Sequence, residues 1–126
     1  MLFVAPVGAS LPASDMYRAQ HFYGDILGLT KMPFNVPGMV MFGAGDSTRF
    51  VLYERTVEPA AHTVAAFLVQ DIEAEVTDLK NRGVTFEEFQ VPGLKTENSI
   101  VDFGFNKTAW FRDSEGNLLS LTQMVQ

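Results

Sequence analysis

The chain has 126 residues, of which 47% are hydrophobic and none is cysteine, so a single domain is expected and disulfides, thiolate zinc sites and a cysteine nucleophile are excluded. Nine Lys and Arg residues against fifteen Asp and Glu residues give a formal net charge of −6. This acidic balance argues against binding to the phosphate backbone of a nucleic acid, which needs a clustered basic surface.

The first half of the chain reads as one strand, one helix and three further strands. The predicted strand Leu2–Ala9 precedes a helix that begins at the N-cap pair Ser14-Asp15 and ends at Gly28. Apolar residues recur along this helix at helical spacing. Three strands follow, at Lys31–Asn35, Met39–Gly43 and Phe50–Tyr53, and Gly45-Asp46 forms the turn between the last two.

The second half repeats this order. A predicted strand, Thr63–Val69, precedes a helix that begins at Asp71 and ends at Gly83. The strands Thr85–Gln90, Thr108–Arg112 and Leu118–Thr122 come next, the last two joined by a turn at Glu115-Gly116-Asn117, in which Asp113 and Asn117 stabilise the turn. The segment Val91–Asn106 contains Pro92, Gly93 and Gly104 and is predicted to be an irregular lid or binding loop.

The order βαβββ therefore occurs twice, in a first module of about residues 1–58 and a second of about 59–126. This order cannot build a doubly wound parallel sheet, which needs regular alternation of strands and helices. We expect an α+β fold in which two βαβββ modules form curved mixed sheets around a concave cleft, within one domain.

Alternation along the strands predicts which sheet faces are free. The uniformly apolar alternates, such as Phe50 with Leu52 and Leu119 with Leu121, should pack on the helices. The opposite faces mix aromatic and polar side chains, which is typical of a small-molecule site, although aromatic residues often serve only as core. The predicted ligand-binding residues are Met41, Arg49, Val51, Tyr53, Phe67, Phe103, Thr108, Trp110, Arg112 and Ser120.

Two motifs, one near each end of the chain, carry a family resemblance. In the run 15–29, Asp15 opens a helix that continues through Phe22-Tyr23 to Leu27-Gly28. The run 109–121 looks like a Phe-x-Asp-Pro-Asp-Gly-Asn hairpin in which Ser114 replaces the proline. Together they resemble the vicinal oxygen chelate (glyoxalase/bleomycin resistance/extradiol dioxygenase) superfamily. The resemblance implies a glyoxalase-like fold, but it covers isomerases, dioxygenases, epimerases, antibiotic-modifying enzymes and non-catalytic drug binders.

The resemblance also implies where a metal would bind. Catalytic members hold one divalent ion with four His, Glu or Gln ligands on four strands, and these positions fall here on Gly8, on Val51 to within one residue, on Ala65 and on Ser120. Three of these residues have no side-chain donor, and a lone neutral hydroxyl is a poor ligand. A displaced site that uses His62 with Glu54 or Glu97 is conceivable but has no positional support, so we expect neither a metal nor another cofactor.

These observations favour a metal-free glyoxalase/bleomycin-resistance-like protein that binds a small aromatic or amphipathic molecule in the cleft. Arg49 and Arg112 would pair either with an anionic group of the ligand or with a surface acid such as Asp113. The acidic charge favours a cationic or neutral ligand.

The alternative is a lyase, isomerase or dioxygenase of the same superfamily that uses a displaced metal, or metal-independent acid–base chemistry by Tyr53, Glu54 or Arg49. A third possibility is an interaction module whose concave face is closed by side chains.

Location and assembly follow from the absence of signals and from the resemblance. The apolar start of the chain has no basic region and is interrupted by Pro6, and no run approaches the roughly 20 apolar residues of a membrane span. We expect a soluble cytoplasmic protein with no membrane partner. The resemblance implies a homodimer, and the apolar ends of the chain, such as Leu2, Phe3 and Met124, support it.

Overall fold

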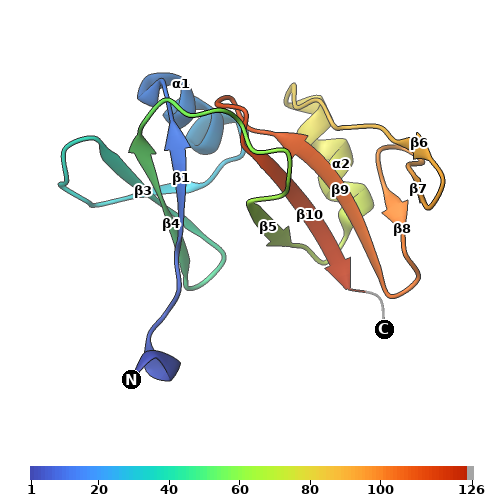
Figure 1. Ribbon diagram of the computed structural model, residues 1–126, viewed down its shortest axis with the longest axis horizontal. Helices are drawn as coiled ribbons and strands as arrows, with labels where there is room; N and C mark the ends of the chain where they lie inside the picture. The colour runs from blue at the N-terminus through green and yellow to red at the C-terminus, as the bar shows by residue number, and fades with distance from the viewer. Residues whose placement is uncertain (125–126) are drawn as a thin grey trace. The chain divides into compact units, whose positions relative to one another are not determined.

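The computed structural model describes residues 1–124 and contains two four-stranded mixed sheets, each with one main helix (Figure 1). The chain divides into two compact units, Met1–Glu58 and a second that begins at Pro59. This is the α+β class that the sequence predicts. In the part of the chain that the structure describes, no helix is long and apolar enough to span a membrane.

In the first unit the sheet has the order β1-β4-β3-β2. The strands are β1 (Ala9–Ala13), β2 (Thr30–Met32), β3 (Met39–Ala44) and β4 (Thr48–Glu54), and β1 runs parallel to β4 while the other pairs are antiparallel. The helix α1 (Met16–Gln20) continues as a π-helix over His21–Ile26. Asp15 caps α1, as predicted, because its carboxylate accepts the backbone N–H of Arg18 at 3.0 Å.

Tyr23 is the centre of the first core. It is fully buried, and its ring centroid lies 6.0 Å from that of Phe42 and 5.2 Å from that of Phe50. Both phenylalanines lie on the helix side of the sheet, where strand register places them side by side. Burial of these aromatic rings is the main force that holds the helix on the sheet.

The predicted strand Leu2–Ala9 is wrong. Leu2–Val4 forms a 3-10 turn, and strand pairing runs instead from Ala9 to Ala13. Leu11 and Ala13 are buried there, with Leu11 beside Leu52, whereas Leu2, Phe3 and Val4 are exposed. The buried side chains therefore select the register, and Pro12 is tolerated because β1 is an edge strand.

The second unit has the sheet order β5-β10-β9-β8. Its strands are β5 (Ala65–Leu68), β8 (Val101–Asp102), β9 (Asn106–Arg112) and β10 (Leu118–Met124), with β5 parallel to β10 and the rest antiparallel. The helix α2 (Ile72–Asn81) is capped by Asp71, as predicted, and buries Ile72, Val76 and Leu79. The helix lies on the sheet face that carries Phe111 and Leu119. Lys107 points to this same face, because Lys107, Ala109 and Phe111 are alternate residues of β9, and its ammonium group lies 2.9 Å from the carboxylate of Glu73 in α2.

Two predictions for the middle of this unit need correction. In the predicted strand Thr85–Gln90, Phe86 forms only an isolated bridge with Phe111, and regular pairing starts at Gln90. The stretch 91–106, predicted to be irregular, contains the hairpin of β6 (Gln90–Val91) with β7 (Leu94–Lys95), and then β8. Strands of two residues are too short to show alternation, so their pairing depends on partners distant in the sequence.

The turn between β9 and β10 is the predicted stabilised turn. The buried carboxylate of Asp113 accepts the backbone N–H groups of Glu115 and Asn117 and the side-chain amide of Asn117, each at 2.8 Å. Gly116 has a φ of 91°, a conformation that glycine adopts without strain. A carboxylate that satisfies three donors in this way makes the turn rigid.

Candidate functional site

The predicted ligand-binding residues fall in both units. Met41, Arg49, Val51 and Tyr53 belong to the first unit, and the second unit holds the other six, Phe67, Phe103, Thr108, Trp110, Arg112 and Ser120. In each unit the helix packs on one face of the sheet, and we call the opposite face the open face because no α-helix of the same unit covers it.

The open face of the first sheet is rich in methionine. Strand register places Met41 beside Val51 and Met39 beside Tyr53, and all lie on the side opposite Phe42 and Phe50. Met32 lies beside Met41 and was missed by the sequence analysis, as was Met39. Met41, Val51 and Tyr53 are half-buried. This surface is apolar and adaptable, because methionine side chains repack readily around different partners.

Arg49 lies at one end of this face, beside Gly43. Its side chain is exposed and makes no hydrogen bond or ion pair with residues 1–124. A shallow cavity of about 240 Å³ adjoins it. The residues that line this cavity are Thr30, Met32, Gly43, Gly45, Asp46, Ser47, Thr48 and Arg49.

The open face of the second sheet carries the one tryptophan of the chain. Register places Trp110 beside Ser120 and Thr108 beside Thr122, opposite the α2 side. Ser120 and Thr108 are buried, and the Thr108 and Thr122 hydroxyl oxygens lie 3.4 Å apart. The half-buried indole donates its N–H to the Thr63 hydroxyl at 3.1 Å.

Phe89 completes this surface. Its ring meets that of Trp110 edge to face, with centroids 5.5 Å apart and planes at 87°. We call the set Trp110, Phe89, Thr108, Ser120 and Thr122 the Trp110 face. Phe89 could not be predicted from the sequence. The segment before β6 pairs with the sheet only at Phe86, and alternation along an unpaired segment does not predict which way a side chain points.

Phe67 does not belong to the Trp110 face, which corrects its predicted position. The parallel register places Phe67 beside Leu121 on the α2 side, and Ala66 beside Ser120. Likewise Ala65, the position carried over from the family, lies beside Leu119 and faces α2. Alternation within β5 shows only that neighbouring residues point to opposite faces of the sheet. The pairing of β5 with β10 decides which of the two alternating sets faces α2.

Arg112 pairs with a surface acid, which is one of its two predicted alternatives, but the acid is Glu87 rather than Asp113. Arg112 donates to the backbone carbonyls of Ala60, at 3.1 Å, and Gly116, at 2.7 Å, and its Nε lies 3.4 Å from the Glu87 carboxylate. These contacts tie the start of the unit to the β9–β10 turn. Because these contacts occupy the guanidinium of Arg112, Arg49 is the more accessible to a ligand of the two predicted arginines.

Phe103 lies in the turn between β8 and β9. Its ring stacks on that of Phe105 with centroids 6.3 Å apart, and the two residues are 40% and 66% exposed. The pair is therefore an aromatic surface feature at the end of a hairpin.

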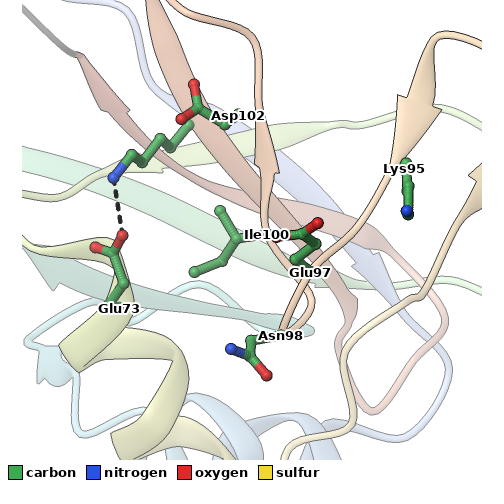
Figure 2. Close-up of a pocket in the computed structure, with 7 residues that line it drawn as sticks. Glu73, Lys95, Glu97, Asn98, Ile100 and Asp102 are labelled. Carbon is green, nitrogen blue, oxygen red and sulfur yellow. Dashed lines mark hydrogen bonds and ion pairs between the residues drawn. The ribbon is translucent and has the colours of Figure 1, made fainter.

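A second cavity lies on the α2 side of the same sheet, and its lining is charged (Figure 2). Its volume is about 400 Å³, and Glu73 and Lys107 form an ion pair across it at 2.9 Å. The hydrogen bond between them lowers the pKa of Glu73 and raises that of Lys107. The remaining lining residues are Lys95, Glu97, Asn98, Ile100 and Asp102.

A polar cluster flanks the lining residues Glu97 and Asn98. The Glu88 carboxylate accepts hydrogen bonds from the hydroxyls of Ser99 and Thr96. These bonds, first from Ser99 and then from Thr96, hold the pKa of Glu88 below its usual value of 4.5 and outweigh the opposing effect of burial.

The lowered pKa predicts a pH dependence of stability. A carboxyl with a depressed pKa in the folded state stabilises the fold above its unfolded pKa, and this contribution disappears as the pH falls through the folded pKa. We expect Glu88→Gln to lower the free energy of unfolding at pH 7, and we expect this difference from the wild type to shrink as the pH falls below the usual value of 4.5 and through the lower pKa of the folded state. Urea unfolding from pH 3 to 7 measures it. Glu75→Gln, on the exposed side of α2, is the control, and an equal difference for both variants at every pH would contradict the prediction.

The comparison with known proteins now decides the family. The model of the Glyoxalase/Bleomycin resistance protein/Dioxygenase superfamily matches residues 5–121. The chain belongs to this superfamily. No curated protein sequence matches it.

Several solved structures share the fold of this chain. A glyoxalase family protein from Bacillus anthracis has a TM-score of 0.76 at 16% identity, and the match covers 97% of each chain. TnmS3, an antibiotic binding protein from a Streptomyces species, has a TM-score of 0.73 at 21% identity, over 97% of this chain and 99% of its own. Lactoylglutathione lyase from Agrobacterium tumefaciens has a TM-score of 0.66 at 21% identity, over 95% and 93%.

The residues at the metal positions of the superfamily do not fit a divalent ion. Gly8 has no side chain, and an added Cβ would lie 3.2 Å from the carbonyl oxygen of Arg49. Val51 is aliphatic, and at the β5 position Ala65 and its neighbour Ala66 are equally without a donor, which leaves only the buried hydroxyl of Ser120. Within residues 1–124, no three His, Asp or Glu side chains gather as a metal site would require.

Proposed function

We propose that this superfamily member binds a small aromatic or amphipathic molecule and does so without a metal. The observation that carries the proposal is the Trp110 face, where a half-buried indole stands beside two buried hydroxyl-bearing residues, Ser120 and Thr108. An aromatic wall with a few fixed polar groups gives a ligand both apolar burial and orientation.

The Met41–Tyr53 face of the first unit supports the same class of ligand. Its methionines, Val51 and Tyr53 offer apolar contacts, and the accessible guanidinium of Arg49 offers a partner for an anionic or acceptor group. The net charge of −6 favours a cationic or neutral molecule as a whole. That TnmS3 is an antibiotic binding protein shows that this fold accommodates such a role.

The alternative function is catalysis as a lyase, isomerase or dioxygenase, and the lyase among the structural relatives motivates it. The side chains at the superfamily's metal positions disfavour this alternative. A binding protein returns the ligand unchanged, whereas an enzyme converts it, so chromatography of the ligand after prolonged incubation separates the two.

Fluorescence tests the proposal directly, because Trp110 is the one tryptophan of the chain. The protein is titrated with a panel of aromatic cations, neutral aromatics and matched saturated-ring compounds. Saturable quenching or a spectral shift with an aromatic member, confirmed by calorimetry, is the expected result. Absence of saturable binding across the panel would contradict the proposal.

Metal removal gives a second test. We expect dialysis against EDTA to leave both the melting temperature and the ligand affinity unchanged, because the metal positions offer no set of side-chain ligands. A metal ion would raise the melting temperature only if the folded protein bound it. Differential scanning fluorimetry with and without Mn²⁺, Ni²⁺ and Zn²⁺ measures the first quantity. A stoichiometric ion that raises the melting temperature of the EDTA-treated protein would favour the enzyme alternative.

The proposal includes a homodimer in the cytoplasm. Leu2, Phe3 and Met124 are exposed apolar side chains, and burial against a second copy would remove them from water. Sedimentation velocity at micromolar concentration tests the assembly, and a monomer at every concentration would remove this part of the proposal without affecting the ligand.

A further inference from the structure

Glu88, Thr96 and Ser99 form a compact polar cluster at the root of the β6–β7 hairpin. Ser99 is fully buried and Thr96 is 4% exposed, so both hydroxyls are shielded from water. Each donates to a different carboxylate oxygen of Glu88, Thr96 at 2.8 Å. Glu88 itself is an exposed residue, and hydrogen bonds to an ionised acceptor are stronger than those between neutral groups.

The cluster holds the backbone of Phe89 at two points. The Phe89 N–H donates to the Thr96 hydroxyl at 2.9 Å, and the Phe89 carbonyl accepts the Thr96 N–H at 3.0 Å. On the other side of Glu88, the N–H of Glu87 donates to the Trp110 carbonyl at 2.8 Å. The segment is thus fastened both to β9 and to the hairpin, with Glu88 in the middle.

No regular sheet pairing orients Phe89. The bridge between Phe86 and Phe111 is isolated, and β6 begins only at Gln90. The hydroxyl and the backbone of Thr96 therefore hold Phe89 together, and the Phe89 ring packs against Trp110 with planes at 87°. The three polar side chains of the cluster do not themselves belong to the Trp110 face.

We propose that Glu88 is a positioning residue for ligand binding: by holding the hydroxyls of Thr96 and Ser99 it fixes Phe89 against Trp110 and so sets the shape of the aromatic wall. This inference rests on the proposed function in one respect, the use of the Trp110 face by a ligand. The positioning itself is a property of the free protein.

Acrylamide quenching of Trp110 fluorescence tests the positioning without any ligand. Phe89→Ala uncovers the indole, and we expect the quenching constant to rise about twofold. Thr96→Val removes the hydroxyl at nearly constant volume and should raise the constant in the same direction, whereas Thr96→Ser keeps the hydroxyl and should resemble the wild type. In the Phe89→Ala background, Thr96→Val should add nothing further.

Glu88→Gln is the second variant if Thr96→Val does not fold, and Ser114→Ala is the matched control. The Ser114 hydroxyl also bonds to a glutamate, Glu115 at 2.8 Å in the same unit, so the control removes the same chemistry elsewhere. An equal rise with Thr96→Val in the presence and absence of Phe89, or no rise in a natively folded Thr96→Val, would overturn the inference.

The ligand panel then separates the two claims. If an aromatic compound binds the wild type and binds Thr96→Val at least threefold more weakly, the cluster positions the ligand site. If the compound binds both equally although quenching by acrylamide has changed, the inference about binding fails and the proposed function stands. If no compound binds the wild type, the proposed function fails, while the acrylamide result still decides the positioning.

Discussion

Replacing Trp110 with alanine should weaken the binding of an aromatic ligand by roughly tenfold to a hundredfold, the loss that follows truncation of an aromatic anchor in a desolvated pocket. The indole is half-buried and bonded to Thr63, so it is held in place before the ligand arrives. Pre-organisation of this kind lowers the entropy cost of binding. Because the variant has no tryptophan, isothermal titration calorimetry measures its affinity.

The matched control for this prediction is Tyr17→Ala, which removes an aromatic side chain that is 89% exposed on α1. We expect its affinity to stay within about twofold of the wild type. Trp110→Phe should retain part of the affinity, since an aromatic ring remains. If Trp110→Ala binds as well as the wild type and Tyr53→Ala does not bind, the ligand uses the methionine-rich face of the first unit instead.

Asp113→Ala should destabilise the protein by about 2–4 kcal/mol. The Asp113 carboxylate satisfies three donors within a turn that also carries the carbonyl bonded by Arg112. Removing it leaves the half-buried N–H of Glu115 and the buried N–H of Asn117 without their acceptor. An unsatisfied buried donor costs more than the average hydrogen bond contributes. Urea unfolding followed by Trp110 fluorescence reports the stability of this unit.

Asp46→Ala is the control for the turn. Asp46 occupies the corresponding β3–β4 turn of the first unit, where it is exposed. Its loss should change the free energy of unfolding by less than about 0.5 kcal/mol. Equal effects of the two substitutions would show that the three hydrogen bonds of Asp113 contribute little, contrary to the prediction.

The features that the sequence predicted correctly are those that neighbours along the chain decide. Asp15 and Asp71 cap their helices because each carboxylate reaches an N–H group three residues ahead. Asp113 and Asn117 close their turn across four residues. The runs 15–29 and 109–121, which contain Asp15 and Asp113, also carry the motifs of the superfamily. Local sequence is therefore sufficient to predict both the superfamily and the fold class.

The features that it predicted wrongly depend on strand pairing. Residues 2–9 and 9–13 are both plausible strands, and only the burial of Leu11 beside Leu52 selects the second. Phe67 has the apolar character expected of a ligand contact, yet its pairing with Leu121 turns it toward α2. For Arg112 only the predicted acid differs, because the structure pairs the guanidinium with Glu87 and not with Asp113.

The lack of donors at the metal positions and the acidic, cysteine-free composition are properties of the sequence itself, because the presence of a donor atom depends only on residue type. The sequence by itself therefore determined three features: the lack of donor side chains at the metal positions, the residues at which the helices begin, and the superfamily that the chain resembles. The tertiary structure alone decided that Phe89 packs against Trp110, that Phe67 faces α2 instead, and that Glu88 accepts hydrogen bonds from Thr96 and Ser99 beside this aromatic pair. Those outcomes depend on strand pairing, hydrogen bonds and ring contacts between separate segments of the chain, and the local propensities of the residues do not predict such contacts.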